Sequence, residues 1–414
     1  MTQIRLKLLL LILTAVTLPA HGQQMALRDG DRVAFYGDSI TAQRLYTRFV
    51  EDIFLTRYPH LHVTFFNAGV PGDTVNGGYT GDMPTRLKRD LFPHQPTVVT
   101  IMLGMNDGYY MPFDQKYLDI YEEGYRKLLG SIQTTLPAAR ITLISPTPYD
   151  ELTHGTEFAH YNQVIARHAA FVKELAATSH LGFSDFFESI TNLTNAGMEK
   201  NPSLAALLVP DRIHPAEASH WVMAAELARS WGASPVVSSV QLDVLQANPV
   251  AAENTHISGL TMDGGKLQWT QVDDALPLPL NLNDGMVQFA LSISDLAEMD
   301  QELLRVDHLS ASRYTLKIDG RVIASFKRDE LAAGVNLALY ATPMLSQARD
   351  VDGIEQKRTR LDEANFILAI EDPKAPDAAG ATKAMEEKDA ALAEQQRKAA
   401  LPVPHIFELI AESM

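Results

Sequence analysis

Short apolar runs alternate with amphipathic segments from about residue 30 to residue 232. The apolar runs predict strands at residues 32–37, 62–69, 97–104, 140–148 and 181–187. Amphipathic stretches predict helices at residues 42–57, 115–136 and 216–231. Apolar strands separated by helices indicate an α/β domain whose parallel sheet is covered on both faces, and we place it at residues 29–234. Right-handed crossovers would then bring the carboxyl ends of the strands to one edge, where ligands bind.

The pattern changes after Gly232. Alternating apolar and polar residues with Asp-Gly turns predict antiparallel hairpins in a smaller β-rich accessory domain at residues 235–329. The runs concerned are residues 240–247, 256–272, 285–294 and 314–328. Residues 330–414 are predicted to be a helical C-terminal region with a linker-like segment after residue 371. Its last segment, residues 401–414, is too apolar to stay free in water and is expected to dock.

The N-terminus has the pattern of a secretory signal peptide, residues 1–22. Arg5 and Lys7 precede an apolar block and then small residues up to Gly22. An uncleaved N-terminal anchor is the alternative. No later segment is long and apolar enough for a membrane span. We therefore expect a secreted or periplasmic protein.

Composition narrows the function classes. The chain has no cysteine, which excludes disulfides, thiolate metal sites and a cysteine nucleophile. A formal net charge of −16 argues against nucleic acid as a partner. His154, His160 and His168 are too irregularly spaced to predict a metal site, and we expect no metal and no cofactor. The sequence does not predict the oligomeric state.

The first predicted strand runs into Gly-Asp-Ser-Ile-Thr at residues 37–41. A strand that stops at a glycine can present Ser39 at the sheet edge, as a nucleophile requires. Asp38 is better suited to holding the turn than to acting on substrate. Taken alone, the stretch also suits an ordinary turn or helix N-cap.

Asp211 and His214 stand three residues apart, just before a helix that Pro215 can start. This spacing lets the carboxylate reach one imidazole nitrogen and leaves the other free to face a hydroxyl. An isolated Asp-x-x-His could equally be half of a metal site or a capping arrangement.

Gly72 and Asn106 follow the second and third predicted strands. A glycine N–H and a side-chain amide are donors of the kind that bind an oxyanion, although both residues are also common in turns. Tyr109, Tyr110 and Met111 come directly after Asn106. They could line a substrate pocket or simply pack in a loop.

Together and in this order, the stretches GDSIT, NAGVPGDT, LGMND and DRIHP resemble the SGNH/GDSL hydrolase family over residues 30–231. The resemblance implies a flavodoxin-like three-layer sandwich with a parallel sheet. It implies a Ser39, His214 and Asp211 triad for ester hydrolysis. It also implies an oxyanion hole made by Ser39, Gly72 and Asn106.

The family acts on several kinds of ester, so the resemblance leaves the substrate open. Export and negative charge favour a carbohydrate O-acetyl or short-acyl ester as substrate. The alternative is a carbohydrate-binding protein in which the SGNH unit is an auxiliary hydrolase or acyltransferase.

Overall fold

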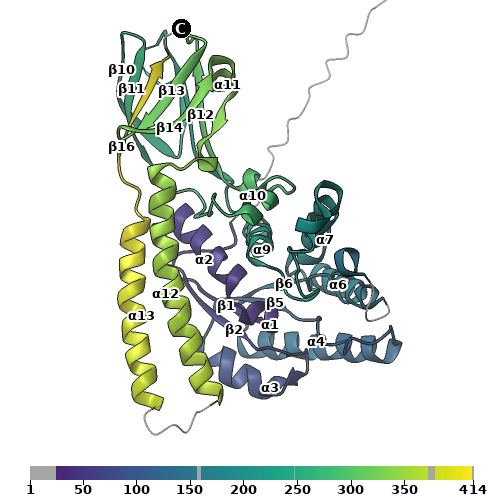
Figure 1. Ribbon diagram of the computed structural model, residues 1–414. Coiled ribbons are helices and arrows are strands. Elements are labelled where there is room, and N and C mark those ends of the chain that lie inside the picture. The colour runs from purple at the N-terminus through teal and green to yellow at the C-terminus, as the bar shows by residue number, and fades with distance from the viewer. Residues whose placement is uncertain (1–24, 156–159, 247, 372–377, 413–414) are drawn as a thin grey trace, which may run out of the picture.

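The computed structural model describes residues 25–155, 160–246, 248–371 and 378–412. The predicted signal peptide lies outside these residues. An α/β domain forms one end of the molecule and a β-rich unit the other, with two long helices running along the side (Figure 1). None of the helices within the described ranges combines the length and apolarity needed to cross a membrane.

The α/β domain is built on a parallel sheet with strand order β2-β1-β5-β6-β7. Its strands are β1 (Arg32–Gly37), β2 (Thr64–Gly69), β5 (Val98–Met102), β6 (Arg140–Ile144) and β7 (Gly182–Ser184). Gly37 pairs with Gly69 on one side and Met102 on the other, so three strands end at the same level. The three-layer α/β fold predicted from the sequence is confirmed.

Helices cover both faces of this sheet. The larger ones are α2 (Leu45–Arg57), α4 (Gln115–Thr135), α6 (Tyr161–Thr178), α7 (Phe186–Lys200) and α9 (Glu217–Ser230). Shorter elements are α1 (Ser39–Ala42), β3 (Gly77–Gly78), β4 (Gly81–Asp82), α3 (Met83–Arg86), α5 (Glu151–His154) and α8 (Pro202–Ala205). Along β1, Val33 and Phe35 face the core under α2 and α9, whereas Ala34 and Tyr36 face the core under α4. Burial on both faces explains why the strand is continuously apolar.

The β-rich unit consists of two sheets with strand orders β10-β11-β16-β13-β14 and β15-β12-β8-β9. The first contains β10 (Thr255–Asp263), β11 (Lys266–Asp273), β13 (Arg313–Ile318), β14 (Arg321–Lys327) and β16 (His405–Ala411). The second contains β8 (Val236–Asp243), β9 (Ala251–Glu253), β12 (Gln301–Asp307) and β15 (Val335–Asn336). Between them lies one apolar core with Trp269 and Leu409 from the first sheet and Leu242 and Leu304 from the second.

Two predictions for the C-terminal half were wrong. The run at 285–294 forms helix α10 (Gly285–Leu291), because Asp284 accepts hydrogen bonds from the amides of Met286 and Val287 and starts a helix. Residues 330–414 are not all helical, since β16 lies between β11 and β13. The apolar end of the chain does dock, as a strand.

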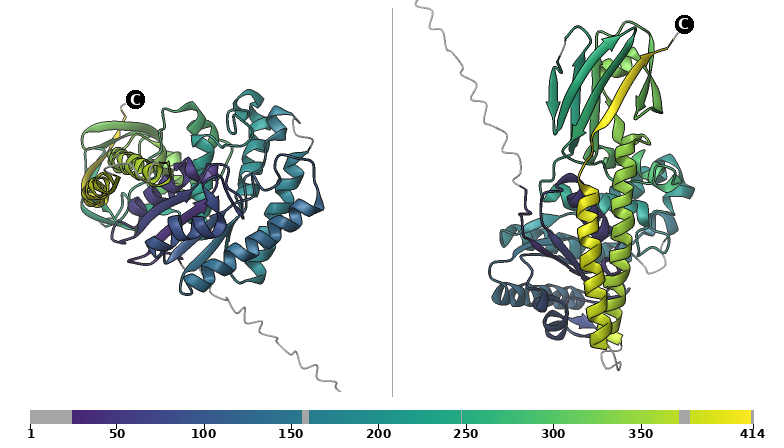
Figure 2. Two further views of the ribbon diagram at one scale, coloured as in Figure 1. Left: turned by 90° about the horizontal axis from the view of Figure 1, so that it is seen from below. Right: turned by 90° about the vertical axis from the view of Figure 1, so that its left-hand side faces the viewer.

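Two long helices, α12 (Pro343–Glu371) and α13 (Ala378–Ala400), form a hairpin beside the α/β domain (Figure 2). A short helix, α11 (Arg328–Ala333), precedes them. Helix α12 packs against α2, where Arg358 forms ion pairs with Glu51, Glu355 and Asp389. The hairpin leaves the β-rich unit after β15 and returns to it as β16, so it joins both parts of the molecule.

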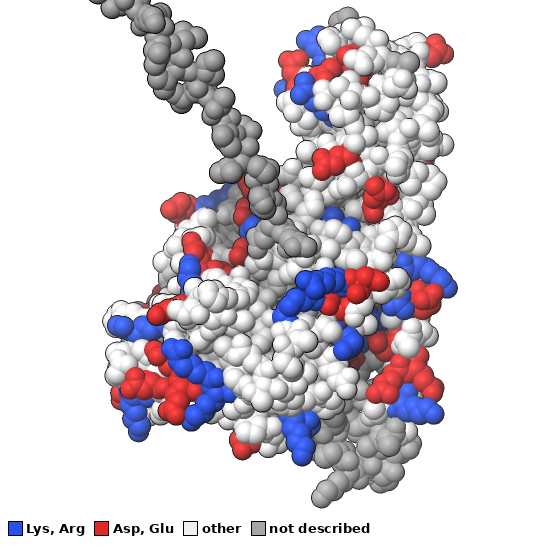
Figure 3. All heavy atoms as spheres, turned by 180° about the vertical axis from the view of Figure 1, so that it is seen from behind, with Lys and Arg blue, Asp and Glu red and all other residues white. Residues whose placement is uncertain are grey.

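Charged side chains of both signs lie close together over the α/β domain, on the face seen in Figure 3. The two signs are interspersed on this face, although the chain as a whole carries a formal net charge of −16.

Candidate active site

Ser39 lies at the junction of β1 and α1. A Cβ atom at Gly37 would lie 2.2 Å from Thr41 Oγ1 and 2.8 Å from the Met102 carbonyl oxygen, so only glycine fits where the strand turns. Asp38 then accepts a hydrogen bond from the Ile40 amide at 3.0 Å and caps α1. Ser39 is the first residue of this helix and is half-buried.

The structure brings the three predicted residues into one hydrogen-bonded chain. His214 Nε2 lies 2.8 Å from Ser39 Oγ, and His214 Nδ1 lies 2.7 Å from Asp211 Oδ2. The other carboxylate oxygen of Asp211, Oδ1, accepts hydrogen bonds from the backbone amides of Ile213 at 3.0 Å and His214 at 2.7 Å. Partial burial opposes the charge on Asp211, but these hydrogen bonds outweigh it and lower its pKa. Helix α9 begins at Glu217, two residues after Pro215, so the prediction that Pro215 starts the helix was wrong.

Gly72 lies in the turn that follows β2. The Asp73 amide donates to the Val70 carbonyl at 3.2 Å, and Gly72 has a φ of +72°. Pro71 and Gly72 in the central positions are typical of a type II turn, whose third residue needs a positive φ. Gly72 is exposed.

The side-chain amide of Asn106 is held at both ends. Its Nδ2 donates to the Asp73 carbonyl at 3.0 Å, and its Oδ1 accepts from the Tyr110 hydroxyl at 3.0 Å. An amide nitrogen has two hydrogens, so one remains for another acceptor. The contact with Asp73 joins Asn106 to the turn that contains Gly72.

The three predicted pocket residues have different surroundings. Tyr110 is half-buried, and its ring packs 5.0 Å from that of Tyr161, measured between centroids. Tyr109 is 55% exposed and Met111 is 47% exposed. Tyr110 therefore supports Asn106, whereas Tyr109 and Met111 are accessible from solvent.

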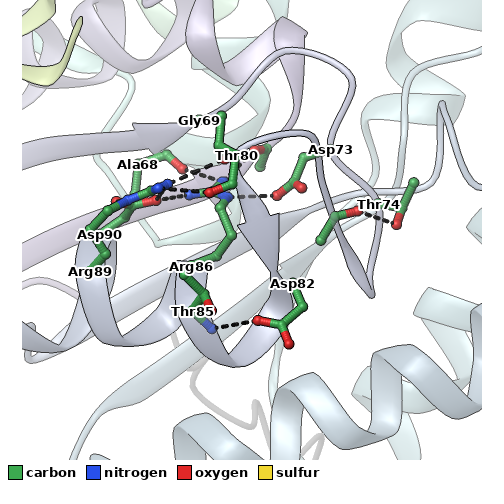
Figure 4. Close-up of polar contacts among 12 residues, drawn as sticks. Ala68, Gly69, Asp73, Thr74, Thr80, Asp82, Thr85, Arg86, Arg89 and Asp90 are labelled. Atoms are coloured by element: carbon green, nitrogen blue, oxygen red, sulfur yellow. Dashed lines mark hydrogen bonds and ion pairs between the residues drawn. The ribbon is translucent and has the colours of Figure 1, made fainter. Parts of the chain in front are cut away.

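Sequence reasoning missed Arg86, which is fully buried beneath this site. Its Nε donates to Asp73 Oδ2 at 2.9 Å and its Nη2 donates to the Ala68 carbonyl at 3.0 Å (Figure 4). It also pairs with Asp90 and lies over the ring of Tyr36. One guanidinium thus joins the end of β2 to the turn that contains Gly72. The only local signal was the four-residue spacing from Arg86 to Asp90, which is common on helices.

Two buried carboxyls lie close to the site. Burial raises the pKa of Asp38 to about 7 and that of Asp107 to about 8. Asp107 Oδ1 accepts the Val75 amide at 2.9 Å, which fixes the segment after Gly72 against the end of β5.

Two of the three histidines considered in the sequence as metal ligands, His154 and His168, have structural partners. Nδ1 of His168 lies 2.9 Å from the Gly104 carbonyl oxygen, and the imidazole ring stacks on Tyr121. Burial lowers the pKa of His168 to about 4. His154 Nε2 lies 2.9 Å from the Val209 carbonyl. Over the described ranges, no group of three or more His, Asp or Glu residues could hold a metal ion.

A serine at the end of the first strand of a parallel sheet, hydrogen-bonded to a histidine and through it to a carboxylate, is the arrangement of a serine hydrolase. The model of the GDSL-like Lipase/Acylhydrolase family matches residues 35–222. This part of the chain belongs to that family, and the protein is a carboxylic ester hydrolase.

The chain is 27% identical to an acetylxylan esterase of Geobacillus stearothermophilus over 229 residues, which cover 50% of this chain and 97% of the relative. It also resembles the solved structure of a gut microbial diltiazem-metabolizing enzyme, at 25% identity and a TM-score of 0.82. That match covers 94% of this chain and 99% of the other. The architecture is therefore shared beyond the α/β domain.

Proposed function

We propose that the protein is an exported serine esterase that removes acetyl or other short acyl groups from carbohydrate esters. The observation that carries this proposal is the continuous hydrogen-bonded chain from Ser39 through His214 to Asp211, at 2.8 Å and 2.7 Å. The acetylxylan esterase similarity supports an acetylated glycan as substrate. The N-terminal pattern of residues 1–22 supports export.

In the proposed reaction, Ser39 Oγ attacks the ester carbonyl carbon and its proton passes to His214 Nε2. The C–O bond to the alcohol then breaks, and the departing oxygen takes the proton from His214. An acyl group remains on Ser39. Water attacks this acyl-enzyme while His214 accepts a water proton, and the proton returns to Ser39 Oγ as the acid leaves. Asp211 holds His214 with Nδ1 protonated and stabilises the imidazolium.

The negative oxygen of the tetrahedral intermediate is bound by the backbone amides of Ser39 and Gly72 and by Asn106 Nδ2. Donors fixed before the reaction stabilise charge as it develops and need no reorganisation. The second hydrogen of Asn106 is suited to this role, because Asp73 and Tyr110 already fix the amide.

The test is a Ser39→Ala variant assayed on 4-nitrophenyl acetate and on acetylated xylan. We expect kcat to fall by at least about 10³-fold, because loss of a nucleophile removes the covalent route. Ser131→Ala, a change at a half-buried serine of α4 whose hydroxyl donates to the Lys127 carbonyl, is the matched control and should retain wild-type activity. More than about a tenth of wild-type activity in Ser39→Ala would rule out Ser39 as nucleophile.

The covalent step has its own measurement. A fluorophosphonate probe should add one label to the wild-type protein and none to Ser39→Ala, as read by intact mass. Labelling at another residue would contradict the assignment. Diltiazem, followed by loss of the parent compound, is a useful third substrate because the similar solved enzyme metabolises it.

A further inference from the structure

A hollow of about 190 Å³ lies between α12 and the segment after β2. This α12 hollow is lined on one side by Glu363, Phe366 and Ile367 of α12, and on the other by Ala42, Arg44 and Pro71. Helix α12 lies outside the residues that match the family model, so this wall is an addition to the hydrolase domain.

The α12 hollow adjoins two parts of the proposed catalytic site. Ala42 ends the four-residue helix that Ser39 begins, and Pro71 directly precedes Gly72. These two segments touch, since a Cβ atom at Gly69 would lie 2.4 Å from the Ala42 amide nitrogen. The hollow is on the β2 side of Ser39, whereas Tyr109 follows β5 on the other side of β1.

Arg44 fixes α12 relative to the segment that carries Ser39. Its backbone has a φ of +59°, and its amide donates to the Thr41 carbonyl at 2.9 Å. Its side chain forms an ion pair with Asp362 and lies 5.5 Å from the ring centroid of Phe366. A left-handed arginine requires support from its surroundings, and here the support comes from α12. The hollow therefore has a defined wall beside the segment that follows Ser39 in the chain.

The lining indicates what the hollow would hold. Tyr79 is 74% exposed and Ile367 is 45% exposed, and the half-buried ring of Phe366 lies beside them. Ligand sites combine such apolar and aromatic surfaces with a few polar groups, here Arg44 and Glu363. The volume is below the ~300–1,000 Å³ of pockets for drug-sized ligands, which suits a single ring better than a long acyl chain.

We propose that the α12 hollow is a subsite for the alcohol part of the ester and holds its ring, a sugar ring in an acetylated glycan. The proposal rests on the proposed function, in which the acyl group is acetyl or another short group. Such an acyl group contains no ring, so a ring bound in the hollow belongs to the alcohol part of the ester. Phe366, Ile367 and Tyr79 contact the ring faces, and Arg44 and Glu363 face its hydroxyl or ester oxygens.

The experiment compares kcat/KM for xylose tetraacetate, which has a ring, with that for methyl acetate, which has none. In the full chain, Phe366→Ala and Ile367→Ala should each lower the ratio of the two values at least fivefold. Ile406→Ala removes an isoleucine of similar exposure on β16 and should leave the ratio at its wild-type value. A ratio that stays within twofold of wild type in both α12 variants would overturn the proposal.

A binding measurement separates this proposal from the proposed function. If hydrolysis of both acetates proved independent of Ser39, the esterase assignment would fail without deciding the subsite. Calorimetric titration of xylose tetraacetate into full-length Ser39→Ala, with and without Phe366→Ala, decides it directly. At least fivefold weaker binding in the double variant supports the subsite, and equal binding overturns it.

Discussion

Asn106 has its side-chain amide fixed by Asp73 and Tyr110, so its effect on catalysis can be separated from its effect on the fold. We expect Asn106→Ala to lower kcat by about 10²–10³-fold with a smaller change in KM, because an oxyanion donor acts mainly where charge develops. Steady-state kinetics on 4-nitrophenyl acetate measure both constants. An unchanged kcat with a raised KM would instead make Asn106 a substrate-binding residue.

Tyr110→Phe tests how much the hydrogen bond to Asn106 contributes while Asn106 itself is kept. It removes the hydroxyl that donates to Asn106 Oδ1 at 3.0 Å but keeps the ring that packs on Tyr161. One neutral hydrogen bond is worth about 1 kcal/mol, so we expect kcat to fall by less than about tenfold. A loss as large as that of Asn106→Ala would mean that Tyr110 itself contacts the reacting ester.

Asp107 should make folding stability depend on pH. Burial raises the pKa of its carboxyl from 3.8 to about 8, so between these values the folded protein binds more protons than the unfolded chain. The free energy of unfolding should then fall as pH rises through this window, by at most about 1.4 kcal/mol per pH unit. Asp107→Asn cannot ionise, and its Oδ1 can still accept the Val75 amide. Urea unfolding of Asp107→Asn at about pH 5 and about pH 8 should show a smaller fall in the free energy of unfolding than wild type shows. An equal fall in the two proteins would contradict this prediction.

The catalytic residues predicted from the sequence all have a signal in their neighbouring residues. Asp211 and His214 are three positions apart, and Ser39 follows a strand that is visible in the sequence. Arg86 has no comparable local signal, because its acceptors Ala68 and Asp73 lie 18 and 13 residues away in the chain. Contacts of this kind depend on the folded sheet, and a single sequence does not reveal them.

At the scale of elements, Arg86 joins the end of β2 to the turn that contains Gly72. Arg86→Met should destabilise the fold by about 3–5 kcal/mol, because Asp73 would remain buried without its charged partner and Asp90 would keep only Arg89. Arg86→Lys keeps the charge but loses the planar fork, so we expect an intermediate loss of stability.

A positioning role for Arg86 predicts a further effect in the Lys variant. At a temperature where it is fully folded, kcat should fall more than KM changes, because the Gly72 amide moves relative to Ser39. Unfolding curves and kinetics on the same preparation test both effects. Full activity together with reduced stability would leave Arg86 with a structural role alone.

Element prediction succeeded where the apolar pattern was clear, and it failed at two places for different reasons. The predicted first strand matches β1 at both ends, and the predicted 115–136 helix matches α4 to within one residue. The 285–294 run has apolar residues that suit a strand, but the Asp284 cap and contacts with the α/β core make it helical. Strand β16 pairs with β11, more than 100 residues earlier, so no neighbouring sequence could indicate its partner.

At the scale of the whole molecule, the C-terminal half completes the core of the α/β domain. Leu278 and Leu280 are at most 1% exposed and belong to the same apolar core as Phe35 and Trp221. The Leu276 amide donates to the Thr56 carbonyl at 2.9 Å. Segments far beyond the family-matched residues therefore stabilise the domain that carries Ser39.

A chain ending at Ser234 should accordingly be insoluble, although it contains every proposed catalytic residue. The cut removes Leu278 and Leu280 from the apolar core, and it leaves the 2%-exposed Arg57 side chain without Asp300, which lies 3.3 Å away. Exposed apolar surface and an unpaired buried charge both favour aggregation or unfolding. Soluble yield and esterase activity of the truncated chain measure this, and a soluble, fully active product would contradict it.

Point variants in the full chain test the same idea without a cut. Leu280→Ala should destabilise the α/β domain by about 2–5 kcal/mol, the usual cost of removing a buried leucine side chain. Leu267→Ala is the matched control, since it empties a comparably buried position in the core of the β-rich unit. Thermal inactivation of esterase activity should begin at a lower temperature in Leu280→Ala than in Leu267→Ala. The reverse order would mean that the stability of the active site is limited by the β-rich unit and not by the packing of residues 275–299.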